Sequence, residues 1–236
     1  MVSMNSEIGH NDLPRLGTPG RALRSEYQDR LDEIDDELVG GALIVAEAMP
    51  HITRAFLVGN RACMDEARGH ADDIVDRCRH VEDQGFILLA REAPVSGDLR
   101  RLVAILRLVN DVDRAGRLMR HVAESVERMD PRLLPVELRQ QLEELAYRSI
   151  EVFRRGLDAW RQRDGLAVHE LDRLDNDVDT LRTGLLVHAR ELDGSPSDVL
   201  VLGLLGRYFE RLADHGVAFA QHVTFVVTGE RVELEP

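Results

Sequence analysis

The sequence predicts an all-α protein made of two three-helix bundles related by internal duplication. Aromatic residues make up only 4% of the 236 residues, which is few for the core of a β-sandwich or barrel. Apolar residues instead recur at steps of three and four along the chain, the spacing of one face of an α-helix. Similar acidic motifs also occur in both halves, about 100 residues apart.

The first half is expected to contain three helices, preceded by a flexible tail at residues 1–21 that is rich in Gly and Pro. The helices are expected at residues 24–60, 63–91 and 98–129. Pro50 lies inside the first of them, and we expect a kink or a short break there because proline lacks the N–H that a helix uses. Residues 93–97 form the turn before the third helix, and residues 130–135, with two prolines, end it.

The second half repeats this plan. Its helices are expected at residues 136–163, 166–192 and 197–227. The Gly- and Pro-containing turn 193–196 leads into the last helix, and residues 228–231 end it. The expected organisation is a tail at 1–21, a first repeat at 22–130, a second repeat at 131–228 and a C-terminal tail at 229–236.

Charge and composition exclude several classes of partner and location. The net charge of −13 repels nucleic acid and anionic lipid. Two cysteines, Cys63 and Cys78, are too few for a disulfide framework, which fits a reducing cytoplasm. The longest uncharged apolar run, residues 199–206, is much shorter than the roughly 20 residues that span a bilayer, and no apolar signal segment opens the chain. We therefore expect a cytoplasmic protein that neither inserts into a membrane nor binds nucleic acid.

Pairs of carboxylates four residues apart recur at matching points of the two halves. The pairs are Asp72 with Asp76, Asp175 with Asp179, and Glu210 with Asp214, and Asp113 stands where the first half matches Glu210. Residues at this spacing project from one face of a helix, where like charges are unfavourable unless a cation binds them. Several such pairs are expected by chance among 43 acidic residues, so the recurrence is the informative observation.

A site built from such pairs favours a metal ion with a preference for oxygen ligands. If the second and third helices of a half are antiparallel neighbours, two pairs meet and offer four carboxylates. This chemistry suits Mg, Mn, Ca or Fe better than a structural zinc, which prefers Cys and His. The second half has the full set. The first half has Arg117 at the fourth position, where its cation is expected to pair with Asp113 and weaken or replace metal binding.

Read together, these motifs resemble the PhoU family of phosphate-signalling regulators. The segment ADDIVD at residues 71–76 and the segment LLAREAPVSGDLR at 88–100 are similar to the acidic helix and following turn of that family. NDVDRAG at 110–116, ERLADH at 210–215 and TGE at 228–230 are similar to its later motifs. The resemblance covers about residues 22–231. Arg117 and Ala93 depart from the family pattern, which expects Asp and Gln there.

The resemblance implies a fold of two three-helix bundles, metal clusters on the paired acidic motifs, and frequent dimerisation. It implies a non-enzymatic, cytoplasmic negative regulator of phosphate uptake and of the phosphate regulon. Such a protein acts between the ATPase subunit of a phosphate ABC transporter and a membrane sensor histidine kinase. The expected cofactor is a divalent or trivalent metal ion: Fe, Mn, Mg or Zn. The expected ligands are Asp175, Asp179, Glu210, Asp214, Asp72, Asp76 and Asp113.

Two other functions remain open on the residues alone. A carboxylate-bridged metal enzyme is one, although its usual Glu-x-x-His motif is missing from the paired motifs. A helical scaffold without metal is the other. His215 and His222 lie near the acidic motif of the last helix and are read either as metal ligands or as structural hydrogen-bonding groups.

Overall fold

The structure, a computed structural model, describes residues 19–92, 94–192 and 196–232. Over these residues it contains six α-helices, two short 3-10 helices and no β-strand. The helices are α1 (Pro19–Leu57), α2 (Cys63–Glu92), α3 (Ser96–Glu124), η1 (Ser125–Glu127), η2 (Pro131–Leu133), α4 (Val136–Gln162), α5 (Val168–Ala189) and α6 (Pro196–Thr228). The all-α prediction is confirmed.

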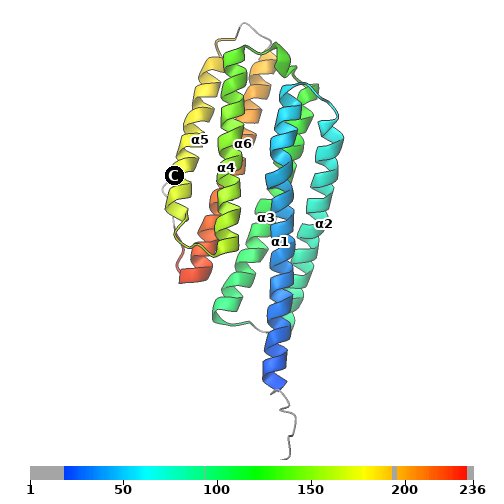
Figure 1. The fold of residues 1–236 in the computed structure, drawn as a ribbon, viewed down its shortest axis with the longest axis vertical. Helices are drawn as coiled ribbons and strands as arrows, with labels where there is room; N and C mark the ends of the chain where they lie inside the picture. Colours follow the sequence, from blue (N-terminus) through cyan, green and yellow to red (C-terminus); the bar gives the residue numbers. More distant parts are fainter. Residues whose placement is uncertain (1–18, 93, 193–195, 233–236) are drawn as a thin grey trace, which may run out of the picture.

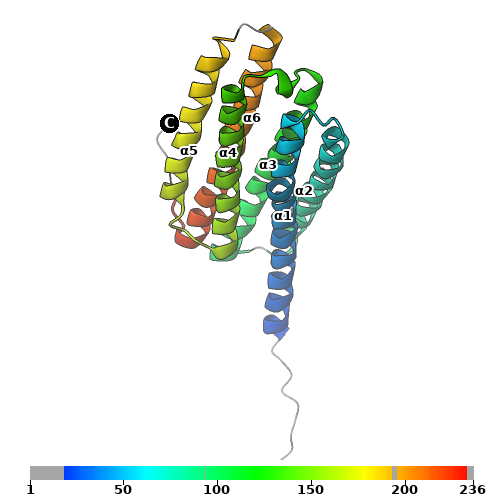
Figure 2. The ribbon, with the colours of Figure 1, turned by 45° about the horizontal axis from the view of Figure 1, so that its top comes forward.

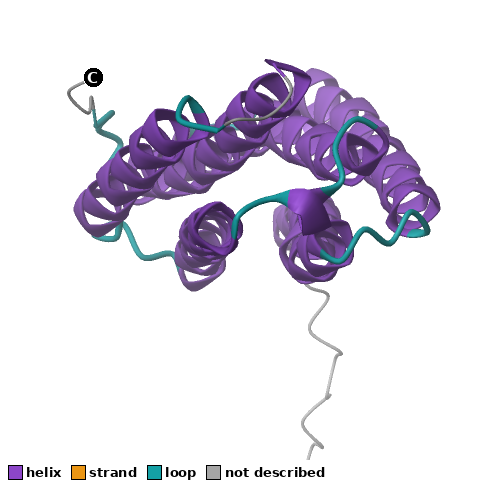
Figure 3. Ribbon diagram, turned by 90° about the horizontal axis from the view of Figure 1, so that it is seen from above, coloured by secondary structure: helices purple, strands orange, loops and turns teal. Residues whose placement is uncertain are grey.

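The helices pack as two triplets that lie side by side (Figures 1 and 2). Within each half, α1–α3 or α4–α6, every helix contacts the other two. The halves meet where α3 packs on α6 and α1 packs on α4. Seen from above, the helices form two layers, and the pairwise contacts place α5, α6, α3 and α2 in one row with α4 and α1 across its face (Figure 3).

The helix bounds agree with the expected spans to within about five residues. The N-terminal boundary is the main correction, because α1 begins at Pro19 and residues 19–21 belong to it rather than to a tail. Proline suits the first turn of a helix, where its missing N–H has no partner to lose. Residues 1–18 and 233–236 of the expected tails lie outside the described residues. The division of the chain into repeats at residue 130 stays a prediction.

Of the kink or short break expected at Pro50, the break is wrong, because α1 continues through this residue to Leu57; the kink stays a prediction. A proline at this position leaves the carbonyl of Ala46, four residues earlier, without its helical N–H donor. The guanidinium of Arg154 on α4 fills the gap, donating to the Ala46 oxygen from Nε at 3.0 Å and Nη2 at 2.7 Å. A side chain of the second half thus donates the hydrogen bonds to a carbonyl that α1 of the first half leaves free.

Replacing Arg154 with alanine should destabilise the protein by about 1–3 kcal/mol, because the part-buried carbonyl of Ala46 loses its charged donor. The same change made in a Pro50→Ala background should cost less, because the alanine introduced there would donate its own N–H to the Ala46 carbonyl. Urea denaturation of the four proteins of this double-mutant cycle measures the difference. Equal losses in both backgrounds would rule out this role for Arg154.

Helices α4 and α6 cross closely at two glycines, Gly156 and Gly216. A Cβ atom added to Gly156 would lie 1.9 Å from the carbonyl oxygen of Gly216, and one added to Gly216 would lie 2.6 Å from the Cα of Phe153. Beside this contact, Phe153 and Trp160 of α4 meet Phe219 of α6 edge to face, with ring centroids 6.0 and 6.4 Å apart. The backbones of α4 and α6 are therefore in direct contact, beside a cluster of aromatic side chains.

Asp35 on α1 ties both halves together through a buried polar cluster. Its Oδ1 accepts a hydrogen bond from Trp160 Nε1 at 2.7 Å, and its Oδ2 accepts from Arg163 Nη2 at 2.5 Å. Arg101 on α3 donates to the same Oδ2 from Nη2 at 2.5 Å. Only 5% of Asp35 is exposed, so these donors replace the water that its charge would otherwise require.

None of the described helices combines the length and the apolar character that a membrane span requires.

Candidate metal centre

The four acidic residues predicted in the second half lie on the facing helices α5 and α6. Asp175 and Asp179 are one helical turn apart on α5, and Glu210 and Asp214 are one turn apart on α6. The apolar residues between them hold the two helices in contact, since Val178, Leu212 and Ala213 are buried. Glu210 is 8% exposed, Asp175 and Asp214 are half-buried, and Asp179 is at the surface.

Electrostatics shows how closely these carboxylates interact. Burial, together with the charges of Asp214, Asp179 and Glu210, raises the pKa of Asp175 to about 7. The pKa of Glu210 is raised by burial and then by Asp214, and burial raises the pKa of Asp214. Negative charge is therefore concentrated between α5 and α6.

Part of this charge is compensated by arginines that the sequence reasoning did not single out. Arg207, three residues before Glu210, forms an ion pair with its Oε1, and Arg182 also lowers the pKa of Glu210. Helical spacing would have revealed Arg207, because residues three apart share a face. Two acceptors are still left over: within the described residues, buried Glu210 Oε2 and Asp175 Oδ1 have no hydrogen-bond partner.

The four acidic side chains of α5 and α6 are not arranged as a metal coordination shell in the structure. Among the described residues, no group of three or more His, Cys, Asp or Glu side chains is arranged closely enough to hold a metal ion. Metal binding at this cluster therefore stays a prediction. The residues fit the role chemically, because hard oxygen ligands suit Mg, Mn or Fe and because Glu210 carries a buried oxygen without a partner.

The first-half positions are arranged differently. Asp72 and Asp76 on α2 are exposed, and Asp76 forms an ion pair with Arg79 at 3.3 Å. On α3, Arg117 holds Asp113 through Nη2 at 2.7 Å and Nε at 3.3 Å. The expected pairing of Arg117 with Asp113 is confirmed. Ala93, the other departure from the family pattern, lies outside the described residues.

The two histidines near the acidic motif have different surroundings. His215 is buried, and its Nδ1 lies 2.9 Å from Asp111 Oδ1, which joins α6 to α3 across the two halves. Burial lowers the pKa of His222, and the charge of Asp111 opposes that shift. The contact of His215 favours the structural reading for that residue, since its Nδ1 is already used in packing the halves together.

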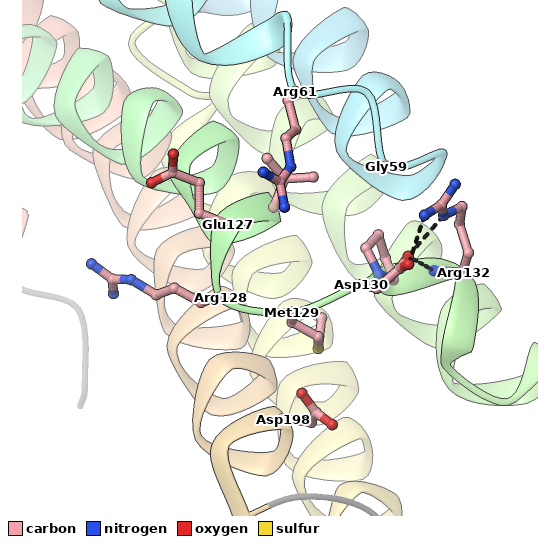
Figure 4. A pocket seen from close by; sticks show the side chains of 10 residues that line it. Gly59, Arg61, Glu127, Arg128, Met129, Asp130, Arg132 and Asp198 are labelled. Atoms are coloured by element: carbon pink, nitrogen blue, oxygen red, sulfur yellow. Dashed lines mark hydrogen bonds and ion pairs between the residues drawn. The ribbon is translucent and has the colours of Figure 1, made fainter.

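A separate polar pocket of about 200 Å³ lies where the two halves join, between the α1–α2 turn, η1, η2 and the start of α6. Arg132 turns onto Asp130 there and donates to both of its carboxylate oxygens, at 2.9 and 2.7 Å (Figure 4). The hydrogen bonds from Arg132 lower the pKa of Asp130 to about 2. Arg132 therefore neutralises Asp130 within the pocket. The pocket was not predicted from the sequence.

The raised pKa of Asp175 makes the stability of the metal-free protein depend on pH. Between its ordinary value of 3.8 and about 7, the folded protein keeps a proton that the unfolded chain has released. Stability should therefore fall as pH rises through this range and level off above it. Urea denaturation in chelator at pH 5 and pH 8 should show a smaller loss for Asp175→Asn than for wild type or for the control Asp177→Asn. An identical pH dependence in all three would contradict the assignment.

Comparison with known proteins identifies the family. A family model of the PhoU domain matches residues 41–126. The phosphate-specific transport system accessory protein PhoU homolog 1 of Mycobacterium leprae is 30% identical over 210 residues, which cover 88% of this chain and 95% of that protein. The chain belongs to the PhoU family. PhoU homolog 2 of Mycobacterium tuberculosis is 29% identical over 88% of this chain and 99% of its own length.

Solved PhoU structures share the fold. The crystal structure of PhoU from Pseudomonas aeruginosa superimposes with a TM-score of 0.80 at 21% identity, covering 86% of this chain and all of that one. The PhoU regulatory protein from Streptococcus pneumoniae gives a TM-score of 0.78 at 20% identity, covering 88% of this chain and all of that one. The resemblance to PhoU proteins inferred from the motifs is therefore confirmed over most of the chain.

Proposed function

We propose that this PhoU-family protein is an accessory protein of phosphate transport that represses phosphate uptake and the phosphate regulon. The observation that supports it most is the 30% identity with the Mycobacterium leprae homolog over almost the full length of both chains. That relative is named as part of a phosphate-specific transport system. A similarity that spans both halves favours a shared role for the whole protein rather than for one domain.

In this role the protein is a non-enzymatic adaptor. It works in the cytoplasm as a homodimer and connects the ATPase subunit of the phosphate ABC transporter with a membrane sensor histidine kinase. The chain supports an adaptor better than a catalyst because it shows neither a glycine-rich phosphate-binding loop nor an ordered set of nucleophile, base and acid. Its paired acidic motifs are instead suited to binding a cation that joins two helices.

Asp175, Asp179, Glu210 and Asp214 are the residues that would bind a metal ion, of the class Fe, Mn, Mg or Zn. A cation there would neutralise the carboxylates that raise the pKa of Asp175 and would give Glu210 Oε2 a partner. Because its ligands come from α5 and α6, the ion would fix the register of these two helices and the surface they form. This role requires no turnover.

Deleting the gene should raise alkaline phosphatase activity in phosphate-rich medium, because the regulon would no longer be repressed. The wild-type gene should restore repression. A double variant, Asp175→Asn with Glu210→Gln, should restore less of it, whereas the exposed control Asp177→Asn should behave as wild type. Unchanged repression in the deletion strain would overturn the regulatory role.

The adaptor role has its own test. Tagged protein captured from phosphate-replete cells should bring down the transporter ATPase and a sensor kinase, identified by mass spectrometry. Capture of neither partner, by a protein that still restores repression, would show that regulation takes another route.

A further inference from the structure

Arg117 is the residue that makes the two acidic motifs of the chain unequal. The motif on α3 begins with Asp113 and ends with Arg117, whereas the matching motif on α6 begins with Glu210 and ends with Asp214. Both oxygens of Asp113 accept hydrogen bonds from Arg117, at 2.7 and 3.3 Å. A guanidinium is charged at every pH the protein meets, and it carries only donors, so it cannot ligate a metal.

We propose that Arg117 is a built-in substitute for a metal ion, so that each chain binds metal at the second-half cluster and not at the first. This inference rests on the metal site proposed above for α5 and α6. It adds that a different cation neutralises the acidic residues of each half: an arginine in the first half and a metal ion in the second.

The acidic residues of the two halves also differ in burial, and this difference too favours metal binding in the second half. In the second half, 8% of Glu210 is exposed, and although Arg207 pairs with its Oε1, its buried Oε2 has no hydrogen-bond partner within the described residues and is free to accept a cation. In the first half, the side chain of Asp76 is 77% exposed and pairs with Arg79. Water and arginine therefore already satisfy the first-half carboxylates, and a metal ion would gain little there.

Charge also opposes a metal ion in the first half. An ion approaching Asp113 would have to displace the two hydrogen bonds from Arg117 and would then face that cation at close range. Three carboxylates and one guanidinium occupy the four first-half positions, against four carboxylates in the second half. Replacing Arg117 with aspartate removes the competing cation and completes the acidic set in one step.

Manganese binding to the full-length protein tests the assignment. Wild type, Arg117→Asp and Asp214→Asn are stripped with chelator, checked for helicity by circular dichroism and titrated with Mn²⁺ by calorimetry, with bound metal counted by elemental analysis. Arg114→Asp, an exposed change on the same helix with the same charge difference, is the control. Arg117→Asp should bind more Mn²⁺ than wild type, by up to about twofold, because it would complete a second set of four carboxylates.

Arg114→Asp should match wild type, and Asp214→Asn should bind little or no Mn²⁺. The inference is overturned if Arg117→Asp gains no Mn²⁺, or if Asp214→Asn keeps half of the wild-type amount, since the first half would then bind metal despite Arg117. Wild type that binds no Mn²⁺ in any amount would instead overturn the metal site proposed for the second half.

Discussion

Changing Gly156 to alanine should destabilise the protein by about 3 kcal/mol or more, because the added methyl group has no space. The new Cβ would lie 1.9 Å from the carbonyl oxygen of Gly216. This neighbour is helix backbone, so no side-chain rotation relieves the clash, and α4 and α6 must move apart around their aromatic core. Urea or thermal denaturation followed by circular dichroism measures the loss.

Gly184→Ala on α5 is the matched control for this substitution. A Cβ at Gly184 meets no heavy atom within 4 Å, so alanine should be neutral or stabilising by up to about 1 kcal/mol through its helix propensity. If Gly156→Ala were as stable as Gly184→Ala, the close crossing of α4 and α6 would be disproved.

The second large effect is expected at Asp35. Asp35→Ala should cost about 3–5 kcal/mol, the range measured when one partner of a buried ion pair is removed. Arg101, Arg163 and the indole N–H of Trp160 would all lose the acceptor they share. Because these donors come from both halves, the loss should appear as a single transition at lower denaturant for the whole protein.

Asp32→Ala provides the comparison for Asp35. Asp32 also binds Arg101, at 2.5 Å, but its side chain is 58% exposed, so its removal should cost no more than about 1 kcal/mol. Equal effects of the two substitutions would show that the buried cluster contributes nothing beyond a surface ion pair.

Local pattern was enough to predict the helices and to place the four second-half carboxylates on α5 and α6. Apolar spacing and the Pro- and Gly-rich turns placed each helix, because both signals act within a few residues of chain. The carboxylates of α5 and α6 were found because each pair is four residues apart on its own helix, and because α5 and α6 are consecutive. The pairing of Arg117 with Asp113 follows from the same spacing.

Contacts between the halves could not be predicted in this way. Trp160 and Asp35 are 125 residues apart, and nothing near either residue indicates the other. A free carbonyl at Ala46 follows from Pro50, but only the packing of α1 on α4 shows that Arg154 satisfies it. The backbone contact at Gly156 and Gly216 likewise depends on how α4 and α6 cross.

The carboxylates between α5 and α6 are proposed to hold a metal ion. Crystals of the full-length protein soaked in Mn²⁺ and measured for anomalous scattering test this claim directly. We expect a strong anomalous peak within ligand distance of Asp175, Glu210 and Asp214, and none beside Asp113. Soaked crystals with no anomalous density between α5 and α6 would contradict the claim.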